Sequence, residues 1–408
     1  MGDLKIAKIA CYICLVLATC PAIDYYCNWY VTIIPVVIIF ISTIRYKYTI
    51  KSLFVASLIV IIQWWGVYRA APLATYFING IIVFVPVFVS LFGNKNADTV
   101  FLKHYLQVSA FLFGITSITT IIGVNLFPGA SRQLASGTAI YDTEIYTRIN
   151  IGGYDFIYAL VLYLPVISWL IINSKGKLKI TNSILLILYL YCIYKSSYTI
   201  ALILTAIVLF IVLINHKTRN SRKLYNTRKS KHKKYLILGC ILLLFLVGSG
   251  SIQSILYWLS SIDPDAYTSD RLLQLAQLYE SGSLNDVSTE TNTERLEFYF
   301  IMINGFKSSP LLGNNLIDFQ QGTVTGHSTI LDLASGLGIV GLLLEFVLLF
   351  HLFRYSVCSS FSKSSLTTKS IWIIFIVASF VNPTFRMLIF FVIFPFTAYL
   401  QAFEKENL

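Results

Sequence analysis

The sequence predicts an all-α polytopic membrane protein, a single integral membrane domain over residues 1–408. The first observation is composition: 56% of the residues are apolar and 15% aromatic, while 12% are charged, about half the share typical of a soluble domain. The second is that apolar runs of about 20 residues recur along the chain, each long enough to cross ~30 Å of hydrocarbon as a helix. Helices are expected because lipid offers backbone polar groups no partner.

About twelve membrane-spanning helices are predicted from the apolar runs. They cover 6–22, 29–44, 52–68, 72–92, 105–127, 153–173, 180–194, 198–215, 235–258, 328–353, 370–385 and 387–402. Helices 180–194 and 198–215 are short for a span and are predicted to form a pair hinged at Lys195, Ser196 and Ser197.

Charge placement predicts the orientation of these helices. Residues 216–235 hold nine Lys and Arg and no acid, so the positive-inside rule makes this basic loop cytoplasmic. Alternation from that loop places both termini and 23 of the 31 cations in the cytoplasm. The basic loop holds only two aromatic residues, Tyr225 and Tyr235, so we expect contact with anionic membrane lipid and no nucleic-acid partner. Two large loops then face outward: 128–152, and 259–327 between the ninth and tenth helices.

Eight cations remain on the outer side, and six of them are arginine. They are Arg69, Arg132, Arg148, Lys195, Arg271, Arg295, Lys307 and Arg386. Arginine carries a planar fork of donors suited to phosphate and carboxylate. Two interpretations stay open for each: an ion pair with a loop acid such as Glu144 or Glu297, or a contact with an anionic ligand from the outer leaflet.

The loop 259–327 is the largest extramembrane segment and ends at His327. A short amphipathic helix is expected from Ser269 to Gly282, and a second from Thr293 to Phe306 on or in the membrane interface. His327 is either a helix cap or a general base, because histidine titrates near neutrality. Nearby Arg295 and Asp332 favour a chemical role.

The motifs around His327 resemble those of the O-antigen and capsule polymerase (Wzy) and O-antigen ligase superfamily. The segment His327-Ser328-x-x-Leu331 followed by Gly338-x-x-Gly341 is similar to its His-Asn/Ser-x-x-Leu…Gly-x-x-Gly signature. Arg295 followed by 307–313 is similar to its Arg…Pro-Leu-Leu-Gly segment, and 152–158 resembles a segment of capsule polymerases from low-GC Gram-positive bacteria.

Two positions depart from the family pattern. Gly336 stands where many members carry a Glu, and Lys195 replaces the Arg of a usual Ser-Arg pair at the hinge. The resemblance implies a GT-C-like helical fold in the cytoplasmic (inner or plasma) membrane of a bacterium.

The reaction implied by the resemblance moves a growing glycan from polyprenyl pyrophosphate onto a hydroxyl of the next lipid-linked repeat unit. His327 would be the base, with Arg295 and either Lys195 or Arg132 on the pyrophosphate. Arg148 and Arg271 are further candidates for binding an anionic sugar or a second lipid. We expect inversion without a metal or cofactor, and a retaining route would need Glu294 or Glu297 as nucleophile. A chain-length regulator and a flippase are the partner proteins implied.

Three alternatives stay open. An O-antigen ligase would use nearly the same chemistry with a lipopolysaccharide acceptor. A polysaccharide flippase or other transporter usually has broken helices and intramembrane charges. The polar residues noted within the spans, Gln63, Asn79 and Gln107, are few and neutral, which argues against a transporter. A sensor or scaffold that only binds glycan would not need His327.

Overall fold

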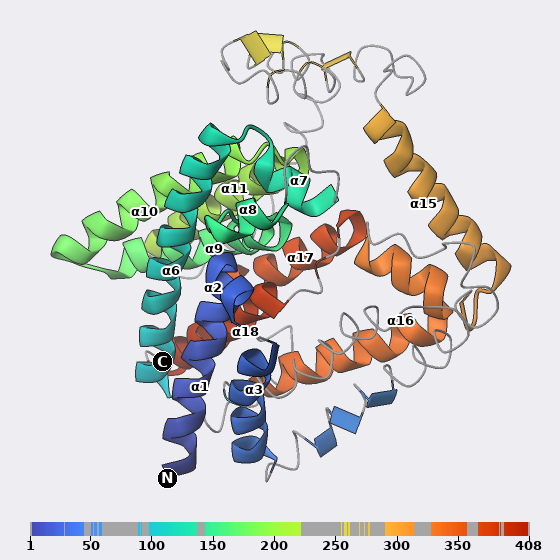
Figure 1. The fold of residues 1–408 in the computed structure, drawn as a ribbon. Helices are drawn as coiled ribbons and strands as arrows, with labels where there is room; N and C mark the ends of the chain where they lie inside the picture. Colours follow the sequence, from blue (N-terminus) through green and yellow to red (C-terminus); the bar gives the residue numbers. More distant parts are fainter. Residues whose placement is uncertain are drawn as a thin grey trace.

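A computed structural model of the chain describes residues 2–27, 29–44, 50–51, 53–54, 57–58, 89, 91, 98–136, 143–221, 254, 257–258, 260–261, 269, 273, 276–277, 290–313, 328–356, 366–382, 384 and 387–406. Within these ranges every regular element is a helix, as the predicted fold class requires (Figure 1).

The helices follow the apolar runs of the sequence. They are α1 (Gly2–Thr19), α2 (Pro21–Tyr26), α3 (Trp29–Thr43), α6 (Thr99–Leu126), α7 (Ala130–Ser136), α8 (Thr143–Arg148), α9 (Tyr154–Asn173), α10 (Gly176–Lys195), α11 (Thr199–Ser221), α15 (Glu290–Ser308), α16 (Thr329–Ser356), α17 (Leu366–Val381) and α18 (Met387–Glu406). The small α7 and α8 lie inside the predicted outer loop 128–152.

Four of these helices are long and apolar enough to cross a membrane: α6, α9, α10 and residues Thr329–Arg354 of α16. Shorter apolar helices lie in α3, α11, α17 and α18. The spans predicted at 52–68, 72–92 and 235–258 fall mainly outside the described residues, so the count of twelve stays a prediction. Helix α10 begins at Gly176, four residues earlier than predicted, because Gly176 adopts a φ of 57° that turns the chain sharply after α9.

Helix α9 forms the centre of the bundle. It is buried over most of its length and contacts α6, α10, α11, α17 and α18. The Phe113 ring of α6 stacks on Phe156 and Tyr163 of α9, with ring centroids 5.4 and 4.8 Å apart. Such offset aromatic pairs stabilise a core beyond the area they bury. This packing fixes the antiparallel pair α6 and α9, whose connection carries α7 and α8.

Three tyrosine hydroxyls inside the bundle donate to backbone carbonyls. Tyr163 donates to the Leu106 carbonyl, Tyr189 donates to the Ala110 carbonyl, and Tyr105 donates to the carbonyl of Phe391. An unsatisfied hydroxyl in an apolar interior costs several kcal/mol, of the order of 2–7. These three bonds therefore join α9, α10 and α18 to α6 in one arrangement.

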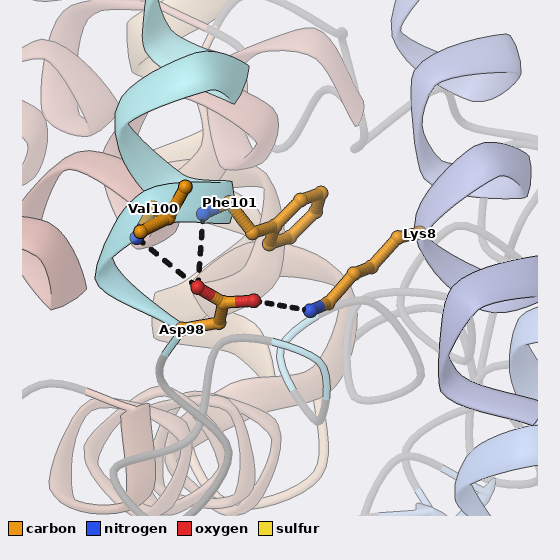
Figure 2. A network of polar contacts seen from close by, with 4 residues as sticks. All are labelled: Lys8, Asp98, Val100 and Phe101. Atoms are coloured by element: carbon orange, nitrogen blue, oxygen red, sulfur yellow. Dashed lines mark hydrogen bonds and ion pairs between the residues drawn. The ribbon is translucent and has the colours of Figure 1, made fainter. Parts of the chain in front are cut away.

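Helices α1 and α6 run in the same direction, and contacts along their length show it. Lys8 donates a 2.6 Å hydrogen bond to Asp98 just before α6 (Figure 2). Further along α6, Thr116 donates to the Thr19 carbonyl at the end of α1. Asp98 is also the N-cap of α6 and accepts from the backbone N–H groups of Val100 and Phe101. The pair joins two segments that the charge pattern assigns to the same side of the membrane.

The Lys8–Asp98 pair predicts a small, acid-sensitive contribution to stability. The hydrogen bond from Lys8 holds the pKa of the Asp98 carboxyl below its ordinary value. The contribution is therefore complete at neutral pH, above the unfolded pKa of ~3.9, and is lost as the pH falls through the folded pKa. Thermal unfolding of Asp98→Asn in detergent should show a deficit at neutral pH that disappears in acid. Because Asn also caps helices, the variant isolates the charge. A deficit that is equal at both pH values would contradict this assignment.

Candidate functional site

Three of the predicted site residues lie where the structure says nothing of their side chains. His327 and Arg271 are outside the described residues, and Arg295 lies in α15, whose described side chains begin at Phe298. Their roles stay predictions. Lys195, Arg132 and Arg148 are described, and so are the Pro-Leu-Leu-Gly and Gly-x-x-Gly segments.

The hinge between α10 and α11 lies against α7 and the start of α9. Ser196 and Ser197 separate the two helices, and Ser197 adopts a φ of 55° that reverses the chain. The Tyr198 hydroxyl donates a 2.6 Å hydrogen bond to the Ser131 carbonyl, and the Ser131 hydroxyl donates to the carbonyl of Gly152. The predicted hinge is confirmed at these residues. Its contact with the loop 128–152 through Tyr198 and Ser131 could not be predicted from the sequence.

Lys195 and Arg132 are brought to the same region by this contact. Lys195 ends α10 three residues before Tyr198, while Arg132 lies in α7 next to Ser131. Arg132 and Asp155 lie close enough to Tyr198 for their charges to interact with its hydroxyl. The rings of Tyr154, Tyr158 and Tyr198 pack together beneath, with centroids 4.4 to 6.1 Å apart. Arg132 is therefore close to this tyrosine cluster, and Lys195 is three residues along the chain from its member Tyr198.

Arg148 lies apart from this cluster. Its guanidinium donates 2.9 Å hydrogen bonds to Glu144 and to the Tyr25 hydroxyl, and it stands 5.2 Å from the centre of the Tyr25 ring. The bond to Tyr25 raises the pKa of the guanidinium above its ordinary value. Arg148 thus forms the loop ion pair that was the alternative to a ligand contact, and it joins α8 to α2.

The two glycine-bearing segments lie in direct contact. Gly338 has a φ of 63° and a ψ of −162°, so α16 is broken there into a first arm (329–337) and a second arm (339–356). At this bend the backbone N–H groups of Ile339 and Val340 donate to the carbonyls of Pro310 and Leu311. In Figure 1 the two arms form a V whose vertex faces the end of α15. The turn 309–313 therefore caps the second arm of α16.

The contact leaves no room for side chains. A Cβ on Gly313 would lie 2.2 Å from the carbonyl carbon of Gly336, and a Cβ on Gly338 would lie 2.5 Å from the carbonyl group of Leu311. Glycine at both positions permits the positive φ and the close approach of two backbones. Gly336, which departs from the motif that the segment resembles, contributes the backbone carbonyl that Gly313 approaches.

The residue after His327 is fixed by hydrogen bonds. Ser328 is fully buried; its backbone N–H donates to Asp332, and its hydroxyl accepts from the Leu331 N–H and donates to the Ser379 carbonyl. The neighbouring Thr329 hydroxyl accepts a 2.8 Å bond from the Thr384 N–H. Sequence reasoning missed this polar junction between α16, α17 and α18. The signal was the run Asn382-Pro383-Thr384 between two apolar runs.

A second missed residue is Glu345 in the second arm of α16. Its side chain is 4% exposed, and neither carboxylate oxygen has a hydrogen-bond partner among the described residues. The argument against a transporter therefore overlooked one intramembrane carboxylate, and α16 is also a broken helix. Among the described residues no group of three or more His, Cys, Asp or Glu could hold a metal ion.

Comparison with known proteins adds no identification: no family model, curated protein or solved structure matches this chain. Function therefore rests on the arrangement of these residues and on the motif resemblance.

Proposed function

We propose that the protein is a membrane-embedded polymerase of lipid-linked oligosaccharide repeat units. The observation that carries the proposal is the contact between the turn 309–313 and the bend at Gly338. The two segments are separate in sequence, each resembles a motif of the same enzyme superfamily, and they bind each other through backbone groups. Their contact is what a shared role at one site would require, and it holds the first arm of α16, which follows His327.

The proposed chemistry needs a base and a set of cations. His327 would accept the proton of the attacking hydroxyl, and Arg295 would stabilise the charge that develops on the departing pyrophosphate. Arg132, which is close to Tyr198, and Lys195, three residues before Tyr198 in the chain, are proposed to bind the pyrophosphate or a second anionic group. Arg148 is a weaker candidate, because Glu144 and Tyr25 already occupy its donors. A single displacement would invert the anomeric centre.

Complementation of a strain lacking this protein tests the proposal. Surface polysaccharide would be resolved on a gel for wild type, His327→Ala and Arg295→Ala at matched membrane levels. We expect single repeat units without a ladder from both variants, a loss of at least about a hundredfold in polymer, as for removal of a catalytic base. His104→Ala and Arg354→Ala serve as controls, since each removes the same residue type from an exposed position on the opposite side in the predicted topology.

A normal polysaccharide ladder from stably inserted His327→Ala would show that His327 is not the catalytic base. An O-antigen ligase would instead leave polymer formation intact and abolish its attachment to the lipopolysaccharide core. These two outcomes separate the polymerase from its nearest alternative.

A flippase or other transporter is the second candidate, and two observations favour it. Helix α16 is interrupted at Gly338, and Glu345 is buried within the same predicted span. Broken helices and intramembrane charges are common in transporters. Lipid-linked repeats that stay on the cytoplasmic side in the deletion strain would favour this candidate over the polymerase.

A further inference from the structure

Glu345 is an acidic residue inside an apolar segment that the proposed chemistry does not use. It lies in the candidate span Thr329–Arg354, seven residues beyond the bend at Gly338, and is almost fully buried. Ionisable residues within membrane spans are rare and expensive, and they mark ion or proton sites more often than structural positions.

The second arm of α16 directs Glu345 into the protein. Gly341, Glu345, Leu348 and Leu352 recur at helical spacing and are all buried, and the two leucines belong to the main core. The other face of this arm exposes large apolar side chains, among them Leu343, Phe346, Val347 and Phe350. The carboxyl therefore faces packed helices, while the opposite face is suited to lipid.

The helices that pack against the second arm of α16 carry few charged side chains among the described residues. Within the described side chains, α15 contributes Lys307 near its end, α17 contributes Lys369 in its first turn, and α18 contributes none. Their titratable tyrosines, Tyr299 and Tyr399, are held by the Val381 carbonyl and the Trp169 ring respectively.

At the start of α16, Asp332 accepts a hydrogen bond from the Ser328 N–H. His351 and Arg354 lie near the other end, where the charge of Lys51 is close to His351. Among the described residues no charge and no hydrogen bond influences the Glu345 carboxyl, whose only perturbation is its burial. An ionised carboxylate would stay unpaired in this environment, which costs several kcal/mol.

We propose that Glu345 is a proton-binding site within the membrane-embedded part of the protein. The carboxyl carries its proton in the conformation described here and releases it when the second arm of α16 moves. A proton fits better than a metal cation, because Na⁺ or Ca²⁺ would need several oxygen ligands and Glu345 belongs to no group of three or more His, Cys, Asp or Glu among the described residues.

The bend at Gly338 gives this site a mechanical connection. The second arm is attached to the turn 309–313 by the bonds from Ile339 and Val340 to Pro310 and Leu311. Loss of the proton would leave a charge that is stable only in contact with water or a cation, so it would favour conformations in which the arm has moved. Proton occupancy and the position of the turn 309–313 are therefore linked. This inference holds for either the polymerase or the transporter.

Labelling with the apolar reagent dicyclohexylcarbodiimide tests the site in native membranes. The O–H of a protonated carboxyl adds across a C=N bond of the reagent, and the product rearranges to a stable N-acylurea with no leaving group. Peptide mass spectrometry would follow Glu345 between about pH 5 and about pH 7. We expect labelling of Glu345 to change less than about twofold over this range, whereas an ordinary exposed glutamate loses about tenfold per pH unit.

The controls make each outcome decisive. Glu345→Gln should lose the adduct and keep the unfolding temperature of the wild type at neutral pH, since Gln is close in shape to the neutral acid. A tenfold loss of Glu345 labelling per pH unit, or no adduct at all in the folded protein, would overturn the proposal. If Glu345 is labelled less in NaCl than in choline chloride of equal concentration, a sodium ion occupies the site in place of the proton, and this would also overturn the proposal.

Discussion

Substitution of Gly338 by alanine is expected to destabilise the protein strongly and to disrupt the bend of α16. The backbone there combines a φ of 63° with a ψ of −162°, a region essentially confined to glycine, where another residue costs about 1–3 kcal/mol. The new Cβ would also lie 2.5 Å from the Leu311 carbonyl group and 2.7 Å from the Gly313 nitrogen. Backbone atoms cannot rotate away, so overpacking adds roughly 1–3 kcal/mol.

The chain offers a control that separates these two costs. Gly176 also has a positive φ, of 57°, but nothing lies within 4 Å of the Cβ that alanine would add. Gly176→Ala should therefore cost only the left-handed strain, about 1–2 kcal/mol. Gly313→Ala should resemble Gly338→Ala, because its Cβ would lie 2.2 Å from Gly336. Thermal unfolding of the three variants in detergent measures the order, and equal losses for all three would show that the close contact has no energetic weight.

The positions of the helices could be read from hydropathy because each apolar run must be long enough to cross the membrane. The hinge could be placed because the polar residues Lys195, Ser196 and Ser197 interrupt two apolar runs, although α10 and α11, at 20 and 23 residues, are longer than the short pair predicted. The break in α16 did not, because glycine is frequent in membrane helices and Gly338 alone gives no sign of a positive φ. Only the approach of the turn 309–313 makes that conformation necessary.

The same reasoning explains the misses at the candidate site. Glu345 stands in the run 339–350, which is otherwise free of charge, so averaged hydropathy hides one carboxylate. The contact of Tyr198 with Ser131 joins residues 67 positions apart, and no local pattern encodes such a pairing. Charge placement singled out Arg132 and Lys195, because the predicted topology leaves few cations on the outer side, and their role stays a prediction.

Replacement of Asn150 by alanine is expected to cost about 2–4 kcal/mol, from three hydrogen bonds of roughly 0.5–1.5 kcal/mol each and a left-handed backbone. Asn150 follows α8 with a φ of 63°. Its side chain accepts from the Ala22 N–H in α2 and donates to the hydroxyls of Thr116 and Thr119 in α6. One residue therefore joins α2 and α6 to the end of α8.

Two further variants separate the contributions at Asn150. Asn150→Gly loses the same hydrogen bonds but tolerates the positive φ, so it should be about 1 kcal/mol more stable than Asn150→Ala. Asn173→Ala removes only one bond, from an exposed amide to the Trp169 carbonyl, and should change the unfolding temperature little. If Asn150→Ala unfolds at the same temperature as Asn173→Ala, the junction of α2, α6 and α8 does not depend on this side chain. The outer loop that carries Arg132 would then be positioned by the Tyr198–Ser131 contact instead.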